Sequence, residues 1–426
     1  MQADTLPLLP DDAPAGPHSG PATTDDAAPA RQDEAPVEYR LRFTGTGDEY
    51  FRIWIVNLLL SILTFGIYSA WAKVRREQYF HRNTLLDGSG FDYHGEPKAI
   101  LKGRIIAVAL LGTLALVDKF AHDFYPLALI ALPLIPWLMI RSFVFRSRNT
   151  SFRGLHFDFH GTYKGLCKAY LVPFLVFIAL AGTVAAVAAV IYTTTELTGM
   201  EGAFRMLVFR KILSGVSLLG MFLLISMLLH RLKAFQFNNL AFGASCFESW
   251  FKLKSFYGIY LRVSVLFPLL VVLAFAPILV TLLLLAGIPV GGVRGIAPGI
   301  VPSIAFAVLI IAIALMYILL LIGPQAWFAV LQNNLIWNKT RLDKHRFKSD
   351  QTFWRFFWVL AGNLLFMILT LGLYWPWARV KIARYRAEHT AVLAAGSLDD
   401  FVAGATREKS AVGEEVAEIF DFDFGF

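Results

Sequence analysis

Residues 64–84 read TFGIYSAWAKVRREQYFHRNT, and residues 370–390 read TLGLYWPWARVKIARYRAEHT. An internal repeat of this length indicates an architecture assembled from copies of one unit. The residues that recur in order are Thr64, Gly66, Tyr68, Trp71, Ala72, Val74, Tyr79 and Thr84, matched by Thr370, Gly372, Tyr374, Trp377, Ala378, Val380, Tyr385 and Thr390.

A second repeat overlaps the first at a constant offset of 66 residues, from Trp71 to Trp137. Fainter copies follow at residues 237–250, 332–348 and 389–401. The residues shared at the 66-residue offset include Trp71, Arg75, Arg82, Asn83, Thr84, Gly88, Phe91, Asp92, His94 and Gly95, matched by Trp137, Arg141, Arg148, Asn149, Thr150, Gly154, Phe157, Asp158, His160 and Gly161.

Each copy places apolar or aromatic residues at alternate positions around a Gly or an Asn. This pattern predicts short two-strand hairpins near residues 82–97, 148–163, 237–250, 332–348 and 389–401. A lone hairpin is marginally stable in water. We therefore expect the hairpins to pair with one another, and with a short strand at Tyr39, Leu41 and Phe43, into one small sheet.

The composition indicates a membrane protein. The 426 residues are 57% hydrophobic and 16% charged, which is more apolar than soluble domains are. Residues 171–191, 263–288 and 300–322 lack a charge and reach the roughly 20 residues of a spanning helix. We expect an α-helical multi-pass protein with no removable signal peptide, and we expect Cys167 and Cys246 to be reduced.

The placement of charge predicts the topology. Lys and Arg cluster in and beside the hairpins, whereas the connections between them carry few cations. By the positive-inside rule, the hairpins and both termini are expected in the cytoplasm. Between hairpins, the chain then leaves and returns in six full spans, at residues 101–117, 124–145, 166–192, 207–229, 256–288 and 300–322.

Two connections are too short for a pair of spans. Only 37 residues separate Gly45 from Asn83, and two spans need about 40. We therefore predict two half-depth, re-entrant hairpins that turn at residues 64–66 and 370–372. The alternative is eight single spans, and whether residues 51–72 and 353–377 cross fully is left open by the sequence.

Composition also divides the chain. Residues 1–36 are acidic and rich in Pro and Ala, which predicts a disordered tail. Residues 37–403 form the predicted repeat-built transmembrane domain with its cytoplasmic hairpins. Residues 404–426 predict an amphipathic, acidic C-terminal tail.

Polar residues inside the apolar runs suggest a site. Asn57 and Asn363 occupy equivalent places, and an amide in hydrocarbon needs a partner. With Tyr68 and Tyr374 they are candidates for a polar mid-membrane site of the kind that broken helices form in transporters. The simpler interpretation is a hydrogen bond between helices.

The hairpins carry two polar pairs, Asp92 with His94 and Asp158 with His160. Residues two apart on a strand share a face, so each pair offers a carboxylate and an imidazole together. Zinc sites show denser Cys/His spacing. We therefore favour a structural role over a metal or acid–base role, and we expect no metal and no cofactor.

Aromatic and basic residues recur near the ends of the apolar runs. This pattern is typical of an interfacial belt, and a cation-binding aromatic cage is the functional alternative. The residues concerned are Trp71, Trp137 and Trp377, together with Arg75, Arg141 and Lys381.

Motifs of nucleotide binding and hydrolysis are absent from the sequence. It contains no GxxxxGK[ST], GxSxG or HExxH. An ATP-driven pump and an ordinary hydrolase are therefore disfavoured, and we expect no enzyme. The net charge of +8 suggests contact with anionic lipid headgroups and not with nucleic acid.

The motifs resemble those of the YjgN family of bacterial inner-membrane proteins, a domain of unknown function. The resemblance rests on GIYSAWAKVRREQYFHRNT, GFDYHG, GLYWPWARVKIARYRAEHT and the closing EEVAEIFDFDFGF, and it covers roughly Phe43 to the C-terminus. It implies a multi-pass protein of the bacterial inner membrane and implies no activity. The Pro-rich start lies outside it.

Two hypotheses of function follow. The first is a transporter or channel-like protein, not driven by ATP, for a small solute, ion or lipid. The alternative is a membrane scaffold or regulatory protein that recruits a cytoplasmic partner. Formation of a homo-oligomer is compatible with both.

Overall fold

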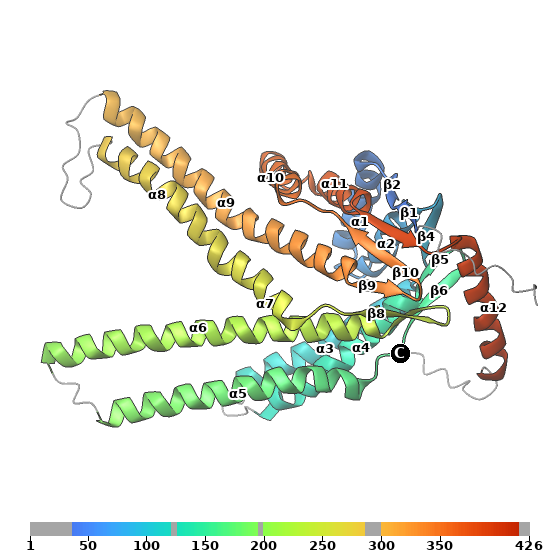
Figure 1. Ribbon diagram of the computed structural model, residues 1–426, viewed down its shortest axis with the longest axis horizontal. Helices are drawn as coiled ribbons and strands as arrows, with labels where there is room; N and C mark the ends of the chain where they lie inside the picture. Colours follow the sequence, from blue (N-terminus) through green and yellow to red (C-terminus); the bar gives the residue numbers. More distant parts are fainter. Residues whose placement is uncertain (1–35, 121–125, 195–198, 286–299, 417–426) are drawn as a thin grey trace, which may run out of the picture. The chain divides into compact units, whose positions relative to one another are not determined.

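The computed structural model describes residues 36–120, 126–194, 199–285 and 300–416. Residues 1–35 of the predicted disordered tail and residues 417–426 of the predicted acidic tail lie outside these ranges. The described chain is mostly helical, and its strands belong to a single sheet (Figure 1).

Four two-strand hairpins build most of this eleven-stranded sheet. Two-residue turns with positive φ join their strands, as at Asp87 (φ 50°) and Gly88 (φ 71°), which is the geometry of tight hairpins. The strands are β3 (Thr84–Leu86) with β4 (Ser89–Tyr93), β5 (Thr150–Phe152) with β6 (Leu155–Phe159), β7 (Leu240–Phe242) with β8 (Ser245–Ser249), and β9 (Thr340–Leu342) with β10 (His345–Ser349).

The sheet closes on itself. β1 (Val37–Arg40) and β2 (Arg42–Phe43) are one strand interrupted at Leu41. β1 pairs with β11 (Thr390–Ala394) at one end of the strand order, and β2 pairs with β3 at the other. The Leu41 N–H donates to the Thr390 carbonyl at 3.0 Å. The result is a β-barrel without a free edge, and not the small sheet expected from the sequence.

The fifth predicted hairpin, at residues 389–401, is wrong. β11 is followed by a helix, α12 (Leu398–Val416). The Ser397 hydroxyl accepts hydrogen bonds from the N–H groups of Asp399 (3.2 Å) and Asp400 (3.4 Å), so Ser397 caps a helix that begins with acidic residues. The predicted domain boundary at residues 403–404 therefore falls inside α12.

Pairs of helices connect the strands. Within the described residues, four apolar segments are long enough to span a membrane: Tyr163–Val190, Leu207–Asn238, Leu253–Leu285 and Phe306–Asn338. The helices are α1 (Gly47–Leu63), α2 (Ser69–Arg82), α3 (Pro97–Phe120), α4 (Pro126–Arg148), α5 (Tyr163–Thr194), α6 (Gly199–Asn238), α7 (Leu253–Leu261), the π-helical turn η1 (Arg262–Leu266), α8 (Phe267–Leu285), α9 (Ile300–Asn338), α10 (Phe353–Leu369) and α11 (Trp375–Glu388). The chain is thus a multi-pass membrane protein.

The two copies of the opening motif form helical hairpins, α1–α2 and α10–α11. Each turns with positive φ at the predicted residues, Phe65 (φ 49°) and Gly66 (φ 89°) in one, and Leu371 (φ 50°) and Gly372 (φ 90°) in the other. The Gly66 N–H reaches back to the Ser61 carbonyl at 2.7 Å, which closes the end of α1 as a Schellman-type cap does.

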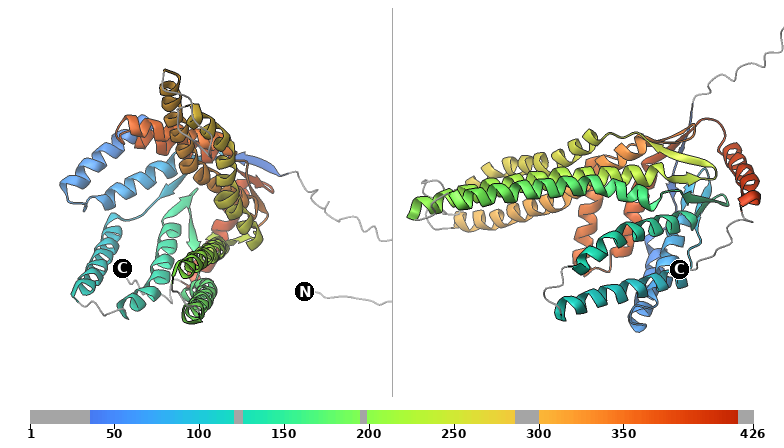
Figure 2. Two further views of the ribbon diagram at one scale, coloured as in Figure 1. Left: turned by 90° about the vertical axis from the view of Figure 1, so that its left-hand side faces the viewer. Right: turned by 90° about the horizontal axis from the view of Figure 1, so that it is seen from below.

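Contacts between neighbouring helices follow the order of the strands. α2 contacts α3, α4 contacts α5, α6 contacts α7, α9 contacts α10, and α11 returns to α1. The left view of Figure 2 shows the helical pairs in succession around the sheet. Each helix that precedes a strand therefore brings its last turns to one end of the barrel.

Candidate functional site

The barrel encloses an apolar cavity of about 590 Å³, a size typical of small-molecule sites. Alternate residues of the strands point inward, as strand geometry requires. Phe91, Phe157, Phe247 and Phe347 occupy the same place in β4, β6, β8 and β10. All four phenylalanines line the cavity, so aromatic rings form a large part of its wall.

Helix α12 lies beside the strands in Figure 1, and its first two turns contribute lining residues to the cavity. Leu398 and Val402 are buried in the barrel core, and Phe401 packs against it. The Phe401 ring also lies 4.4 Å from the His345 ring. Gly243, at a hairpin turn, has no room for a side chain, since a Cβ there would lie 2.8 Å from the Cβ of Ala405. The C-terminal helix is thus part of the barrel.

His345 lines the cavity at the end beside α12. Its ring is buried, and Nδ1 accepts a hydrogen bond from the Ala395 N–H at 3.3 Å. Burial holds the pKa of the His345 imidazole below its ordinary value, so the neutral ring is favoured.

The last turns of the helices form the opposite end of the cavity. The helical residues that line it lie three, four or seven positions before the first residue of the following strand, a spacing that shares one helix face. They are Phe80, Phe237, Asn333, Trp337, Ala383, Arg386 and Ala387.

A second cavity of about 410 Å³ adjoins the first. The two share Leu41, Phe80, Phe91 and Phe157 among their lining residues. The second cavity adds polar groups from the ends of α2 and α4, namely His81, Arg146 and Ser147. The apolar interior of the barrel therefore continues into a basic compartment beside the helices.

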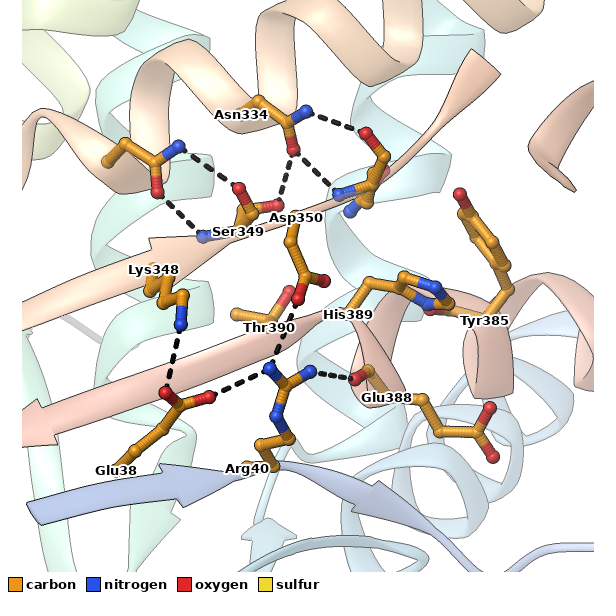
Figure 3. A network of polar contacts seen from close by, with 12 residues as sticks. Glu38, Arg40, Asn334, Lys348, Ser349, Asp350, Tyr385, Glu388, His389 and Thr390 are labelled. Atoms are coloured by element: carbon orange, nitrogen blue, oxygen red, sulfur yellow. Dashed lines mark hydrogen bonds and ion pairs between the residues drawn. The ribbon is translucent and has the colours of Figure 1, made fainter. Parts of the chain in front are cut away.

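Ion pairs hold the closing strand in place (Figure 3). Arg40 of β1 contacts Glu38 at 2.9 Å and also contacts Asp350, the residue after β10, at 3.1 Å. Lys348 of β10 contacts Glu38 at 2.9 Å. The hydrogen bond from Lys348 and the nearby Arg40 charge hold the pKa of Glu38 below its ordinary value. These contacts connect β1 to β10, across the intervening strand β11.

An amide network fixes the end of α9 to β10, also visible in Figure 3. The Asn334 carbonyl oxygen accepts from the Ser349 hydroxyl (2.7 Å) and from the Gln351 N–H (3.1 Å), and its amide donates to the Gln351 carbonyl (2.8 Å). Asn338 exchanges two hydrogen bonds with the Ser349 backbone. The network positions Gln351, which lines the cavity.

The predicted mid-membrane residues lie away from this cavity. Asn57 and Asn363 are buried in α1 and α10, and the Asn363 amide donates to the Ala378 carbonyl of α11 at 3.3 Å. The Oδ1 atoms of both, and the Tyr68 hydroxyl, have no hydrogen-bond partner among the described residues. Tyr374 stacks on Trp377 at 5.8 Å. For Asn363, the simpler interpretation of a bond between helices fits.

The Asp/His pairs are tied into the hairpins. Arg82 binds Asp92 at 2.9 Å, and Arg148 binds Asp158 at 3.1 Å. His94 lies 2.8 Å from the Ser151 hydroxyl, and His160 lies 3.7 Å from Asp158. Across the described ranges, no three His, Cys, Asp or Glu side chains gather as metal ligands would.

These pairs predict a pH dependence of stability. Burial opposes ionisation, yet hydrogen bonds from Arg82 and the Tyr93 N–H keep the pKa of Asp92 below its ordinary value, and the Phe159 N–H and Arg148 do so for Asp158. The stabilisation is therefore complete above about pH 4 and is lost as pH falls through the lowered pKa. Because the pairs are partly exposed, each contributes about 1 kcal/mol or less.

We expect Asp92→Asn with Asp158→Asn to lower the melting temperature slightly at pH 7 and to remove part of the loss of stability seen as the pH falls below about 4. Thermal unfolding across this range measures the effect. Asp400→Asn, at an exposed residue of α12, is the control. If the melting temperature of the double variant fell at low pH as much as that of wild type, Asp92 and Asp158 would not be the source of this pH dependence.

The predicted interfacial residues form contacts of their own. Arg75, Arg141 and Lys381 lie over the rings of Tyr68 (5.7 Å), Trp137 (5.6 Å) and Tyr374 (5.2 Å). Trp377 donates to Asp48 at 3.0 Å and stacks on Phe51 at 4.9 Å, and Trp71 stacks on Tyr68 at 6.1 Å. Within the described chain, the aromatic rings beside Arg75, Arg141 and Lys381 already hold a cation of the protein.

Sequence reasoning missed the residues that line the cavity. The aromatic alternation of the hairpins indicates strands, and it does not show that the strands close around a space. The residues three, four and seven positions before each strand also follow from the repeats. Aligning the five helix ends would have placed Arg146 and Arg386 at one position.

Comparisons with known proteins identify the family of the chain. The family model of a bacterial protein of unknown function, DUF898, matches residues 38–419. The chain belongs to the DUF898 family. Within this family, it is 26% identical over 371 residues to the inner membrane protein YjgN of Salmonella typhimurium, covering 85% of this chain and 89% of that protein.

The corresponding YjgN protein of Escherichia coli K12 is 26% identical over 242 residues, which cover 55% of this chain and 57% of that protein. The resemblance to the YjgN family is thereby confirmed. The names of these DUF898 relatives and the apolar helices support a location in the inner membrane. No solved structure matches the chain.

Proposed function

We propose that this inner-membrane protein binds a lipid-like molecule in its barrel and exchanges it with the membrane. One observation supports the proposal above all others. An apolar cavity of about 590 Å³ lies against the last turns of helices that are apolar enough to span a bilayer, such as α6 and α9. An apolar chain gains roughly 0.8 kcal/mol for each methylene that leaves water.

The proposal includes the topology. We place the barrel and both termini in the cytoplasm, with six full spans and the hairpins α1–α2 and α10–α11 at half depth. α1 has 17 residues and α2 has 14, each shorter than a full span. Phe65 and Leu371, at the two turns, are almost fully exposed, as side chains that insert into lipid would be.

A scaffold that recruits a partner through basic hairpins is supported less well. Arg153 binds Asp87 at 2.8 Å and also Asp399 of α12, and Arg148 binds Asp158. Two of the cations that such a partner would need are thus already paired within the chain. Of the two hypotheses, we therefore keep the transporter and narrow its substrate to a lipid-like molecule.

Binding of a neutral fluorescent acyl ester to the purified, full-length protein tests the proposal. Leu240 lines both cavities, so the larger side chain of Leu240→Trp is expected to occupy the space of the chain and to weaken binding at least tenfold. Leu261→Trp, at an exposed position of α7, is the matched control and should bind as wild type does.

Two results would overturn the proposal. One is a wild-type protein that does not bind the ester, and the other is equal binding by the two tryptophan variants. Melting temperatures of both variants distinguish a blocked cavity from an unfolded barrel.

A further inference from the structure

The inward face of the helix ends carries cations. Arg146 of α4 and Arg386 of α11 each lie four positions before the first residue of the strand that follows the helix. Lys233 of α6 lies seven positions before the first residue of β7. Arg146 and Arg386 line the cavities. Lys233 occupies the position that Asn333 and Ala383, both lining residues, occupy in their own helices.

The cations beside the second cavity form a cluster. The positive charge of Arg146 repels those of Lys73 and Lys233, and the charge of Arg104 repels that of Lys73. The four come from α2, α3, α4 and α6. Like charges held near one another repel, so this arrangement favours a bound anion.

Among the described residues, these cations have no carboxylate partner; Arg104 donates to the Ser69 hydroxyl, and Lys233 donates to the Gln236 amide oxygen at 3.4 Å. Arg82, Arg148, Arg153 and Arg341 each contact a carboxylate within 4.0 Å. In the described ranges, Lys73, Arg104, Arg146 and Lys233 have no such contact. Glu77, the acidic residue that acts on Lys73, is bound to Arg76 at 2.7 Å. Lys73, Arg104 and Lys233 are partly buried, whereas Arg146 is exposed at the edge of the second cavity. Partly buried charges without a counter-ion are costly.

We propose that the ligand is an anionic amphiphile, whose phosphate or carboxylate binds beside Arg146 and Lys233 while its apolar chain occupies the barrel. The inference rests on the proposed function and adds the class of substrate. The second cavity shares its apolar wall with the first and adds Arg146 at its edge. A headgroup there is continuous with a chain inside the barrel. Arginine and lysine both bind phosphate and carboxylate oxygens well.

Competition with the neutral acyl ester tests the inference in the full-length protein. Dodecyl phosphate and dodecanol carry the same chain and differ in charge. In wild type, we expect dodecyl phosphate to bind about a hundredfold more tightly, or roughly tenfold for each of two cations that bind the anion. In Arg146→Gln with Lys233→Gln, the two affinities should agree within about threefold, while dodecanol binds as in wild type.

The control is Lys211→Gln, an exposed lysine in the same helix as Lys233, which should keep the wild-type preference for phosphate. Melting temperatures check that each variant folds. Inorganic phosphate alone should compete only weakly, since it lacks the chain.

The outcomes separate the two proposals. Equal affinities for dodecyl phosphate and dodecanol in wild type would overturn the inference and leave the proposed function standing. Failure of both compounds to displace the ester, or of the ester to bind, would overturn the proposed function and the inference with it. Inorganic phosphate that competes as well as dodecyl phosphate would assign the cations to a free anion, which also overturns the inference.

Discussion

Val402→Asp is expected to detach helix α12 from the barrel and to open the cavity at that end. Val402 is 9% exposed and belongs to the barrel core with Leu398, Phe242 and Phe152. Its burial contributes about 1.5–3 kcal/mol, and an unpaired carboxylate in its place costs several kcal/mol more. Undocking of α12 removes that cost, so we expect the helix to leave before the whole protein unfolds.

Limited proteolysis of α12, followed with the melting temperature and with binding of the acyl ester, measures this effect. The expected result is rapid cleavage within α12 and loss of binding. Ala403→Asp is the matched control, because Ala403 is the next residue of the same helix and is exposed. Equal protease resistance in the two variants would show that α12 does not depend on its apolar face.

The sequence predicted the local units well because their causes are local. Asp87-Gly88 and Arg153-Gly154 have positive φ at adjacent residues, as two-residue turns require. The breaks at Gly66 and Gly372 lie in the motif whose recurrence first revealed the repeat. In both cases, a few neighbouring residues determine the conformation.

Closure of the barrel could not be predicted in the same way. Closure depends on the chain at Leu41, which lies between β1 and β2. β1 pairs with β11, and β2 pairs with β3. Period-2 alternation shows that Phe91 and Phe157 share a face, and it does not show whether that face encloses a space. Contacts between residues far apart in the chain decide this.

The polar site predicted from the sequence and the cavity lie in different parts of the fold for a related reason. Asn57 and Asn363 were selected because an amide in an apolar run needs a partner. That reasoning identifies residues under constraint. For Asn363 the amide nitrogen donates to the Ala378 carbonyl within its own hairpin, while its Oδ1 has no partner among the described residues. The larger cavity is built from ordinary apolar residues such as Phe247 and Phe347, which carry no unusual signal one at a time.

The fold combines a closed barrel with helices whose last turns reach its interior. Every strand hairpin follows a helix directly, so a shift in one helix end moves both the wall of the cavity and the cations beside it. Lipid that contacts the spans and a ligand in the barrel would therefore act on the same residues. This arrangement is suited to exchange between membrane and cavity.

Leu41→Pro is expected to open the barrel at its seam, the junction of β1 and β2 where the sheet closes. Proline has no N–H, so the bond from Leu41 to the Thr390 carbonyl is lost where β1 and β2 meet the two ends of the sheet. The lost bond, the unpaired carbonyl and the removed side chain together cost about 3 kcal/mol or more. The melting temperature should fall by several degrees, and binding of the acyl ester should be lost.

Leu41→Ala is the control that separates backbone from side chain. It keeps the N–H and the seam but removes apolar atoms that line both cavities, so it should destabilise by about 1–2 kcal/mol and still bind the ester. A proline variant that melts and binds as the alanine variant does would mean that this bond does not hold the barrel closed. The β1–β11 and β2–β3 pairings and the ion pairs of Arg40 and Lys348 would then be sufficient to keep the barrel closed.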